Sequence, residues 1–200
     1  MKNLVLSLFA LLSTTLVFAS TGDPVVKSVN IEKSTIEWKG YKVTGSHTGT
    51  LNVQSGSLNF DENGNLSGGS FILDMASIKN TDMKGGGAAK LEGHLKSADF
   101  FGVENHPTAK LVITDVEKDG NGTHIITGDF TIKGITEAIS FPASVSASDD
   151  GSLQATADIV VDRTLFGIKY GSGTFFDNLG DRSINDNFEL RITLRASVGQ

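Results

Sequence analysis

Apolar and polar residues alternate along two long segments of the chain, at 153–161 and at 188–198. A period of two is typical of a β-strand with one buried face, so both segments are predicted strands. In the second segment, Glu189, Arg191 and Thr193 occupy the polar positions, and we expect them to face water. The register should direct the intervening side chains into the core: Phe188, Leu190, Ile192 and Leu194.

Shorter β-type segments and turn residues fill most of the remaining chain. Segments rich in β-branched and aromatic residues occur at 36–38, 71–73, 111–113, 126–132 and 139–141. Clusters of Gly, Asn and Asp, which tolerate the positive φ of hairpin turns, occur at 61–65, 118–122, 133–134 and 149–152. Strands joined by short turns pair as antiparallel hairpins. The pattern therefore predicts an all-β fold, either an antiparallel sandwich or a closed barrel.

One segment between residues 77 and 107 interrupts this pattern. Its apolar residues follow a helical spacing of three and four: Ala88, Leu91, Leu95 and Ala98. This spacing predicts a short amphipathic helix at 87–97, with Lys90, Glu92 and Lys96 on its other faces. Three successive glycines at 85–87 weaken the start of this helix.

The first residues have the pattern of an export signal. Lys2 precedes an uncharged apolar run from Leu4 to Phe18, and small or modest residues lead up to Ala19. We expect a signal peptide at residues 1–19 and a mature chain, residues 20–200, that is periplasmic or secreted. The alternative is a retained membrane anchor, but the run is shorter than the roughly twenty residues that cross a bilayer.

Composition narrows the chemistry that the chain can perform. The 200 residues carry a formal charge of −6 and include no cysteine, which excludes disulfides, thiolate metal sites and cysteine catalysis. The acidic balance argues against a nucleic-acid partner. The four histidines lack metal-binding spacing, and no catalytic motif or cofactor motif is recognisable. Asp99, His94 and His106 are the few acid or base candidates, and the sequence pairs none of them with a partner.

Two features follow the predicted strand at 153–161. Arg163 stands where this strand ends, so it is a candidate for binding an anionic head group at the rim of the fold. The structural alternative is that Asp162 or another carboxylate holds Arg163 and fixes the loop. The loop also contains four aromatic residues that we expect to cover an apolar surface: Phe166, Tyr170, Phe175 and Phe176. Residues 171–174 resemble half of a phosphate loop but are interpreted as a surface loop.

Several blocks of the sequence resemble the YceI-like family of lipocalin-like, polyisoprenoid-binding proteins. The resemblance covers nearly all of the mature chain and is carried by residues 34–40, 45–49, 69–78, 90–101, 106–109, 126–136 and 162–167. It implies a closed antiparallel barrel of about eight strands with a short helical insertion, exported in many members. It also implies an interior that holds a long isoprenoid or a similar amphiphilic lipid, and it does not imply an enzyme.

The resemblance and the strand pattern together give a set of expected lipid-binding residues. These are Trp38, Phe71, Leu73, Ile113, Phe130, Ile132, Phe141, Ile159, Phe166, Leu190 and Ile192. Small inward residues, Gly128, Ala155 and Ala157, should leave room for a ligand. The expected partner is a polyisoprenoid or other long-chain lipid, with only transient membrane contact and with a homodimer as one oligomeric possibility. The alternatives are an enzyme that acts on isoprenoid lipids and a packed structural or interaction barrel without a ligand.

Overall fold

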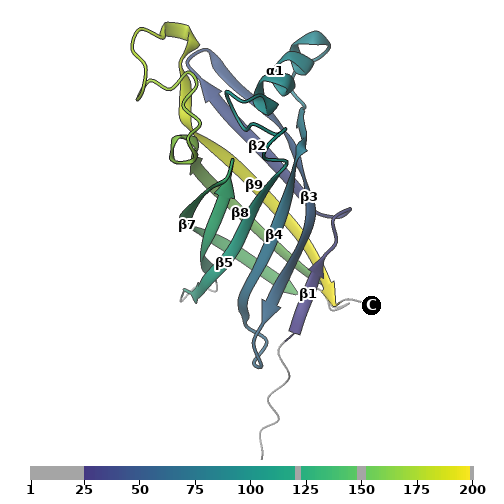
Figure 1. Ribbon diagram of the computed structural model, residues 1–200. Helices are drawn as coiled ribbons and strands as arrows, with labels where there is room; N and C mark the ends of the chain where they lie inside the picture. Colours follow the sequence, from purple (N-terminus) through teal and green to yellow (C-terminus); the bar gives the residue numbers. More distant parts are fainter. Residues whose placement is uncertain (1–24, 120–122, 148–151, 199–200) are drawn as a thin grey trace, which may run out of the picture.

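The computed structural model describes residues 25–119, 123–147 and 152–198 (Figure 1). The expected signal peptide and the turn residues 120–122 and 149–151 lie outside this part of the chain. The strands and the helix are, in chain order, β1 (Val25–Val29), β2 (Thr35–Lys42), β3 (Gly45–Phe60), β4 (Leu66–Asn80), α1 (Gly86–Lys96), β5 (Thr108–Lys118), β6 (His124–Ile132), β7 (Ile135–Ala147), β8 (Leu153–Asp162) and β9 (Ile184–Val198). Two short 3-10 helices, η1 (Arg163–Phe166) and η2 (Gly180–Arg182), lie between β8 and β9.

The strands form one antiparallel sheet that closes into a barrel. Each strand from β2 to β9 pairs with the next, and β9 pairs back with β2. The short strand β1 pairs with β3 and β9, the same two strands that flank β2. The strands β1 and β2 therefore share one place in the barrel wall, one after the other along β9. The chain therefore has the closed antiparallel eight-stranded barrel that the resemblance implies, and not the sandwich that the strand pattern alone left open.

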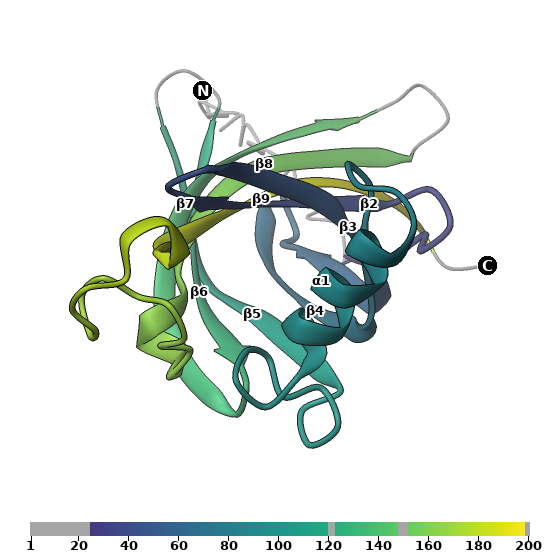
Figure 2. The same cartoon turned by 90° about the horizontal axis from the view of Figure 1, so that it is seen from above.

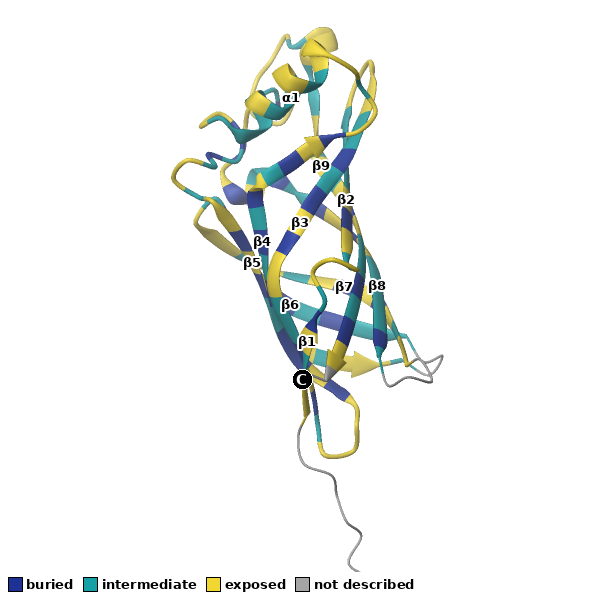
Figure 3. Ribbon diagram, turned by 90° about the vertical axis from the view of Figure 1, so that its right-hand side faces the viewer, coloured by how far each residue is buried: buried dark blue, intermediate teal, exposed yellow. Residues whose placement is uncertain are grey.

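The register of β9 agrees with the predicted alternation. Leu190 and Leu194 are buried, and Phe188 and Ile192 pack against the core from partly buried positions. Arg191 lies on the outer face, where its Nε donates to Asp158 Oδ1 of β8 at 2.9 Å. Figure 3 shows the same alternation of buried and exposed positions along several strands. One apolar face per strand thus lines the barrel interior, because the strands turn that face inward.

The predicted turn clusters form hairpin turns where the structure describes them. The Asp61 carboxylate accepts hydrogen bonds from the N–H groups of Asn63 and Asn65, at 2.9 and 2.8 Å. These and further hydrogen bonds from Asn65 and Gly64 hold the pKa of Asp61 below its ordinary value. Lys133 and Gly134 both adopt positive φ, 51° and 78°, as a two-residue hairpin between β6 and β7 requires.

Helix α1 lies across one side of the barrel opening (Figure 2). It occupies the predicted position to within one residue, and its Leu91 and Leu95 are partly buried against the end of the barrel. Glu92 lies against β4, where its Oε1 accepts from the N–H of Asn80 at 2.9 Å. Within the described residues, no helix combines the length and apolar character needed to cross a membrane.

Gly128 does not leave open space in the barrel, contrary to the sequence-based expectation. A Cβ atom at this position would lie 2.7 Å from the carbonyl oxygen of Val112 and 3.1 Å from a methyl group of Leu111. The glycine therefore permits a close approach of β5 to β6 rather than making room for a ligand. Ala155 and Ala157 do line an internal cavity, as expected.

Candidate functional site

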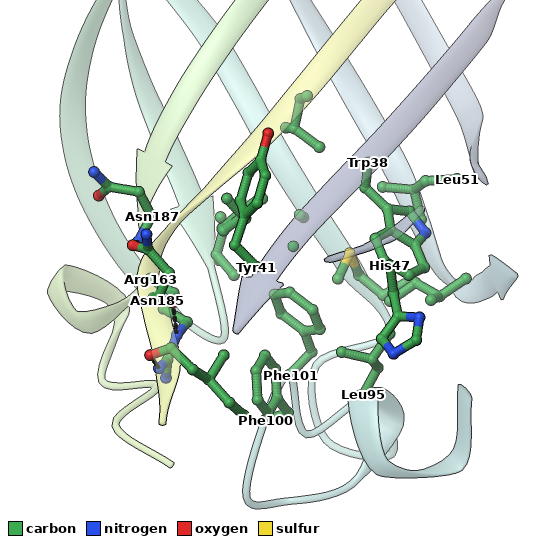
Figure 4. A pocket seen from close by; sticks show the side chains of 18 of the residues that line it. Trp38, Tyr41, His47, Leu51, Leu95, Phe100, Phe101, Arg163, Asn185 and Asn187 are labelled. Atoms are coloured by element: carbon green, nitrogen blue, oxygen red, sulfur yellow. Dashed lines mark hydrogen bonds between the residues drawn. The ribbon is translucent and has the colours of Figure 1, made fainter. Parts of the chain in front are cut away.

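The end of the barrel that carries α1, the β2–β3 turn and segment 163–183 is called here the mouth end (Figure 1). A cavity of about 140 Å³, the mouth cavity, lies just inside it. Figure 4 shows Arg163, Asn185 and Asn187 on one side of this cavity and Trp38 and His47 on the other. Apolar side chains make up most of the remaining wall, including Leu51, Leu73, Met75, Ile78, Leu91, Leu95, Phe100, Phe101, Phe130, Ile132, Phe188 and Leu190.

A second cavity of about 60 Å³, the inner cavity, lies deeper in the barrel. Its lining is apolar apart from Thr156, and it includes Ala143, Ala155 and Ala157, whose small side chains leave the space unfilled. Three residues line both cavities and form the partition between them: Leu73, Phe130 and Leu190. The barrel interior is thus a series of two apolar chambers rather than a solid core.

The structure distributes the predicted lipid-binding residues over both chambers. The mouth cavity is lined by Trp38, Leu73, Phe130, Ile132 and Leu190. The inner cavity is lined by Phe71, Leu73, Ile113, Phe130, Phe141, Ile159, Leu190 and Ile192. Phe166 lines neither of these cavities. It is 1% exposed and packs edge-on against Phe130, with 6.0 Å between the ring centroids.

Trp38 reaches its place in the mouth cavity because a glycine stands opposite it on β3. Trp38 pairs with Gly49, and a Cβ atom there would lie 2.5 Å from the indole ring and 1.8 Å from the carbonyl oxygen of Lys79. The indole Nε1 donates to that same carbonyl at 3.2 Å. Gly49 therefore lets the ring lie flat against the junction of β2, β3 and β4.

The contribution of α1 and the turn after it was missed by the sequence-based prediction. Leu91, Leu95, Phe100 and Phe101 all line the mouth cavity. The helical spacing of Leu91 and Leu95 signalled an apolar face, but only the closed barrel shows that this face covers a cavity. Tyr41 and His47, on the two sides of the β2–β3 turn, were also not predicted. Both side chains carry polar groups, so the sequence did not indicate that they point into the barrel.

Arg163 is buried rather than placed at an open rim. Only 1% of the residue is exposed, and its guanidinium donates to three backbone carbonyls: Nη1 to Ile168 at 2.7 Å, Nε to Asn185 at 3.0 Å and Nη2 to Ile184 at 3.0 Å. Nη2 also meets Asp186 Oδ1 at 3.4 Å. The guanidinium lies over the ring of Phe100, 5.4 Å from its centroid. Most of its donors are thus committed within the protein.

The carboxylate that holds Arg163 is Asp186 and not Asp162. Asp162 Oδ1 instead accepts from the N–H and Oγ1 of Thr164, which caps η1. Burial raises the pKa of Asp186, but hydrogen bonds from Ser172 and Thr174 and the charge of Arg163 outweigh it, so this pKa lies below its ordinary value. Burial lowers the pKa of Arg163, although both aspartates oppose that shift.

Segment 171–174 is not a plain surface loop, because Ser172 is fully buried. The aromatic residues nearby also differ from the expectation that they cover an apolar surface. Phe166 is buried, but Tyr170, Phe175 and Phe176 are 48%, 44% and 51% exposed. Phe100 and Phe101 line the mouth cavity instead, and Tyr170, Phe175 and Phe176 keep about half of their surface exposed.

Two histidines, His47 and His94, are among the residues that line the mouth cavity. His94 Nε2 is buried and has no hydrogen-bond partner within the described residues, and its ring packs edge-on against Tyr170 and Phe100, with centroids 4.6 and 5.4 Å away. His47 Nδ1 lies 3.0 Å from Asp82 Oδ2. Burial raises the pKa of Asp82, but hydrogen bonds with His47, Asn80 and Thr48 bring it below the ordinary value. His94 thus lines the mouth cavity with a ring whose Nε2 is buried and has no hydrogen-bond partner within the described residues.

Residues 27–196 match the YceI-like domain, which covers nearly all of the barrel. The chain belongs to the YceI-like family. A UPF0312 protein of Pseudomonas putida strain F1 is 31% identical over 144 residues, which span 68% of this chain and 71% of the relative.

Solved structures share the fold of this YceI-like chain at low sequence identity. BcnA of Burkholderia cenocepacia aligns with a TM-score of 0.67 at 18% identity, covering 84% of this chain and 99% of that protein. A polyisoprenoid-binding domain of Saccharophagus degradans aligns at 0.64 with 11% identity, covering 86% and 98%. The YceI protein of Campylobacter jejuni aligns at 0.56 with 18% identity over the whole of both chains. At these identities the likeness establishes the fold.

Proposed function

We propose that this YceI-like protein is an exported carrier or scavenger that holds a polyisoprenoid, or a similar long amphiphilic lipid, inside its barrel. The observation that carries the proposal is the series of two apolar chambers that begins at the mouth end. The fold shared with a polyisoprenoid-binding domain of Saccharophagus degradans supports the ligand class. The signal-like residues 1–19 support export.

The energetics favour a long ligand over a short one. At about 0.8 kcal/mol per buried methylene-sized group, one five-carbon isoprene unit contributes about 4 kcal/mol. Association costs about 4 to 15 kcal/mol, so one or two units do little more than offset this cost. Affinity should therefore rise with each further isoprene unit until the barrel is full.

The ligand must displace the partition to occupy both chambers. An apolar cavity of about 150 Å³ holds a molecule of the size of benzene, so the mouth cavity of about 140 Å³ admits only a short part of a lipid. Drug-sized ligands occupy sites of about 300 to 1,000 Å³. Leu73 and Leu190 can change rotamer, and together with Phe130 they separate the chambers. We infer that ligand binding rotates these three side chains and joins the chambers.

Within the described residues, His94 and His106 lack the carboxylate partner that acid–base catalysis uses, whereas His47 of the mouth cavity has one in Asp82. A general acid or base needs a partner that sets its protonation state and orientation. Within the described residues, no carboxylate is hydrogen-bonded to His94 or His106, and Arg163 is committed to backbone carbonyls and Asp186. We therefore assign no catalytic step to these groups, and we propose that His94 Nε2 contacts the polar end of the lipid.

A binding titration with chamber-filling variants tests the proposal. Ala109 lines the mouth cavity and Ala157 lines the inner cavity, so Ala109→Leu and Ala157→Leu each reduce the space for a ligand. Ala138 is exposed on β7, so Ala138→Leu adds the same three carbon atoms outside the barrel. Each folded variant is titrated with a fluorescent isoprenoid of about four units.

The expected result is a loss of affinity of about tenfold or more in both chamber-filling variants and none in Ala138→Leu. Equal affinity of all four proteins would place the ligand outside the barrel. Failure of the wild-type protein to bind isoprenoids of any length would overturn the proposed function.

A further inference from the structure

Large apolar side chains are exposed at the mouth end. Leu165, Phe175 and Phe176 are 53%, 44% and 51% exposed in segment 163–183, and Tyr170 is 48% exposed. Val43, at the tip of the β2–β3 turn, is 67% exposed, and its N–H donates to the carbonyl of Ser183 at 3.3 Å. These five residues are called here the mouth patch. Single exposed apolar residues are common, but a group on adjoining turns indicates an interaction surface.

The two phenylalanines project from a turn that is held by the protein interior. The N–H groups of Phe175 and Phe176 both donate to the carbonyl of Ser172, at 3.2 and 3.0 Å, and Ser172 is fully buried. Thr174 Oγ1 donates to Asp186 Oδ2 at 2.6 Å, which ties the same turn to the carboxylate beside Arg163. The rings are therefore presented to solvent from a fixed base.

Basic residues accompany the mouth patch. Lys169 Nζ lies 4.4 Å from the centroid of the Phe175 ring. Lys42, at the end of β2, and Lys84 and Lys90, before and within α1, are also exposed, and α1 lies across the barrel opening from segment 163–183 (Figure 2). Acidic residues are exposed at the mouth end as well, with Asp177 and Asp181 in segment 163–183 and Asp82, Asp99 and Glu104 near α1. The charge of this end is therefore mixed, and the basic contact to the patch itself is that of Lys169 with Phe175. Aromatic rings beside lysines are typical of surfaces that lie in the interface of a bilayer.

We propose that the mouth patch docks on the surface of a bilayer that contains anionic phospholipids. This inference rests on the proposed function, because a lipid carrier must bring its opening to the membrane that its ligand leaves. Arg163 and Ile184 flank the segment that carries most of the patch, and both line the mouth cavity. Docking therefore places the cavity opening against the bilayer, and the apolar chain of the ligand enters without crossing water.

Flotation with vesicles tests the docking surface. Wild-type protein is mixed with vesicles of phosphatidylcholine and phosphatidylglycerol, and with vesicles of phosphatidylcholine alone. The double variant Phe175→Ser, Phe176→Ser removes two exposed rings, and Leu165→Ser is a second, independent variant. Val160 is 64% exposed on the outer wall of β8, so Val160→Ser is the matched control. Lys169→Glu tests the charge, and circular dichroism verifies that each variant folds.

The expected result is that the wild-type protein and Val160→Ser float with the mixed vesicles. The double variant should lose about tenfold or more of this binding, and Leu165→Ser should lose part of it. Lys169→Glu should weaken binding to the mixed vesicles more than it weakens binding to vesicles of phosphatidylcholine alone. The proposal is overturned if the wild-type protein does not float, or if Val160→Ser and the double variant bind equally. It is also overturned if the double variant only converts a dimer to a monomer in size-exclusion chromatography, since a second copy would then cover the patch.

A parallel titration in the absence of vesicles separates this inference from the proposed function. The double variant should bind a fluorescent isoprenoid as the wild-type protein does, because neither ring lines the mouth cavity. Absence of isoprenoid binding in every protein would refute the proposed function, whereas normal isoprenoid binding without flotation would refute only the docking surface.

Discussion

Replacement of Arg163 by methionine separates a structural role from a role in binding a lipid head group. The guanidinium is 1% exposed and donates to the carbonyls of Ile168, Ile184 and Asn185 and to Asp186. Methionine has a similar volume but no donor, so the variant leaves three carbonyls and one carboxylate without their partner. Loss of one member of a buried ion pair costs about 3 to 5 kcal/mol.

This cost is large enough to measure by thermal unfolding. For a domain of this size, each kcal/mol changes Tm by about 2 to 4 °C, so Arg163→Met should melt about 6 to 20 °C below the wild-type protein. Arg163→Lys should recover only part of the loss, because an ammonium group lacks the planar fork that reaches several carbonyls at once. Arg191→Met is the matched control, since the pair between Arg191 and Asp158 is 72% and 76% exposed and should affect Tm little.

Near-ultraviolet circular dichroism follows unfolding, and isoprenoid titration well below the Tm of each variant follows binding. The structural role predicts a lowered Tm with isoprenoid affinity within about threefold of wild type at the lower temperature. A Tm within about 2 °C of wild type, combined with selective loss of affinity for an isoprenoid pyrophosphate over its uncharged analogue, would refute this reasoning and assign Arg163 to the head group.

Three further predictions follow from particular contacts. Gly49→Ala should destabilise the fold by about 1 to 3 kcal/mol in denaturant unfolding, because its Cβ would meet Lys79 and Trp38, whereas Gly40→Ala meets nothing within 4 Å and should be tolerated. Asp186→Asn should lower Tm at pH 7. The difference in Tm between this variant and the wild-type protein should begin to shrink at about pH 3.9, the ordinary pKa of an aspartate, and should vanish once the pH is below the lowered pKa of Asp186. The reason is that the stability contributed by this carboxylate is present only while it is ionised. Unchanged Tm differences between about pH 3 and pH 7 would contradict this role. Phe130→Ala should join the two chambers and shift the preferred isoprenoid to a longer chain in titrations of graded length, and an unchanged preference would contradict the partition.

The all-β fold class was predictable because the strands obey one simple rule, whereas the choice of a closed barrel over a sandwich came from the resemblance to the YceI-like family. The alternation in 188–198 sets which face of β9 is buried, and the turn residues at 61–65 and 133–134 connect neighbouring strands. Local periodicity therefore carries the fold class and the inward register. It does not report distances between strands, which explains why Gly128 was mistaken for a site that leaves room.

The candidate site was less predictable because it depends on contacts between distant segments. Arg163 meets carbonyls that follow it by five to twenty-two residues, and its carboxylate partner is Asp186 rather than the adjacent Asp162. Backbone carbonyls carry no sequence signal. The exposure of Phe175 and Phe176 depends in the same way on the buried Ser172 beneath them.

Mass spectrometry of lipid extracted from the purified, folded protein tests the central claim most directly. The protein is produced with its first 19 residues, recovered without detergent and compared with Ala157→Leu, in which the inner cavity is reduced. The account predicts an isoprenoid lipid at close to one molecule per barrel in the wild-type protein and much less in the variant. Recovery of no lipid from the wild-type protein, together with no uptake of added isoprenoids, would contradict it.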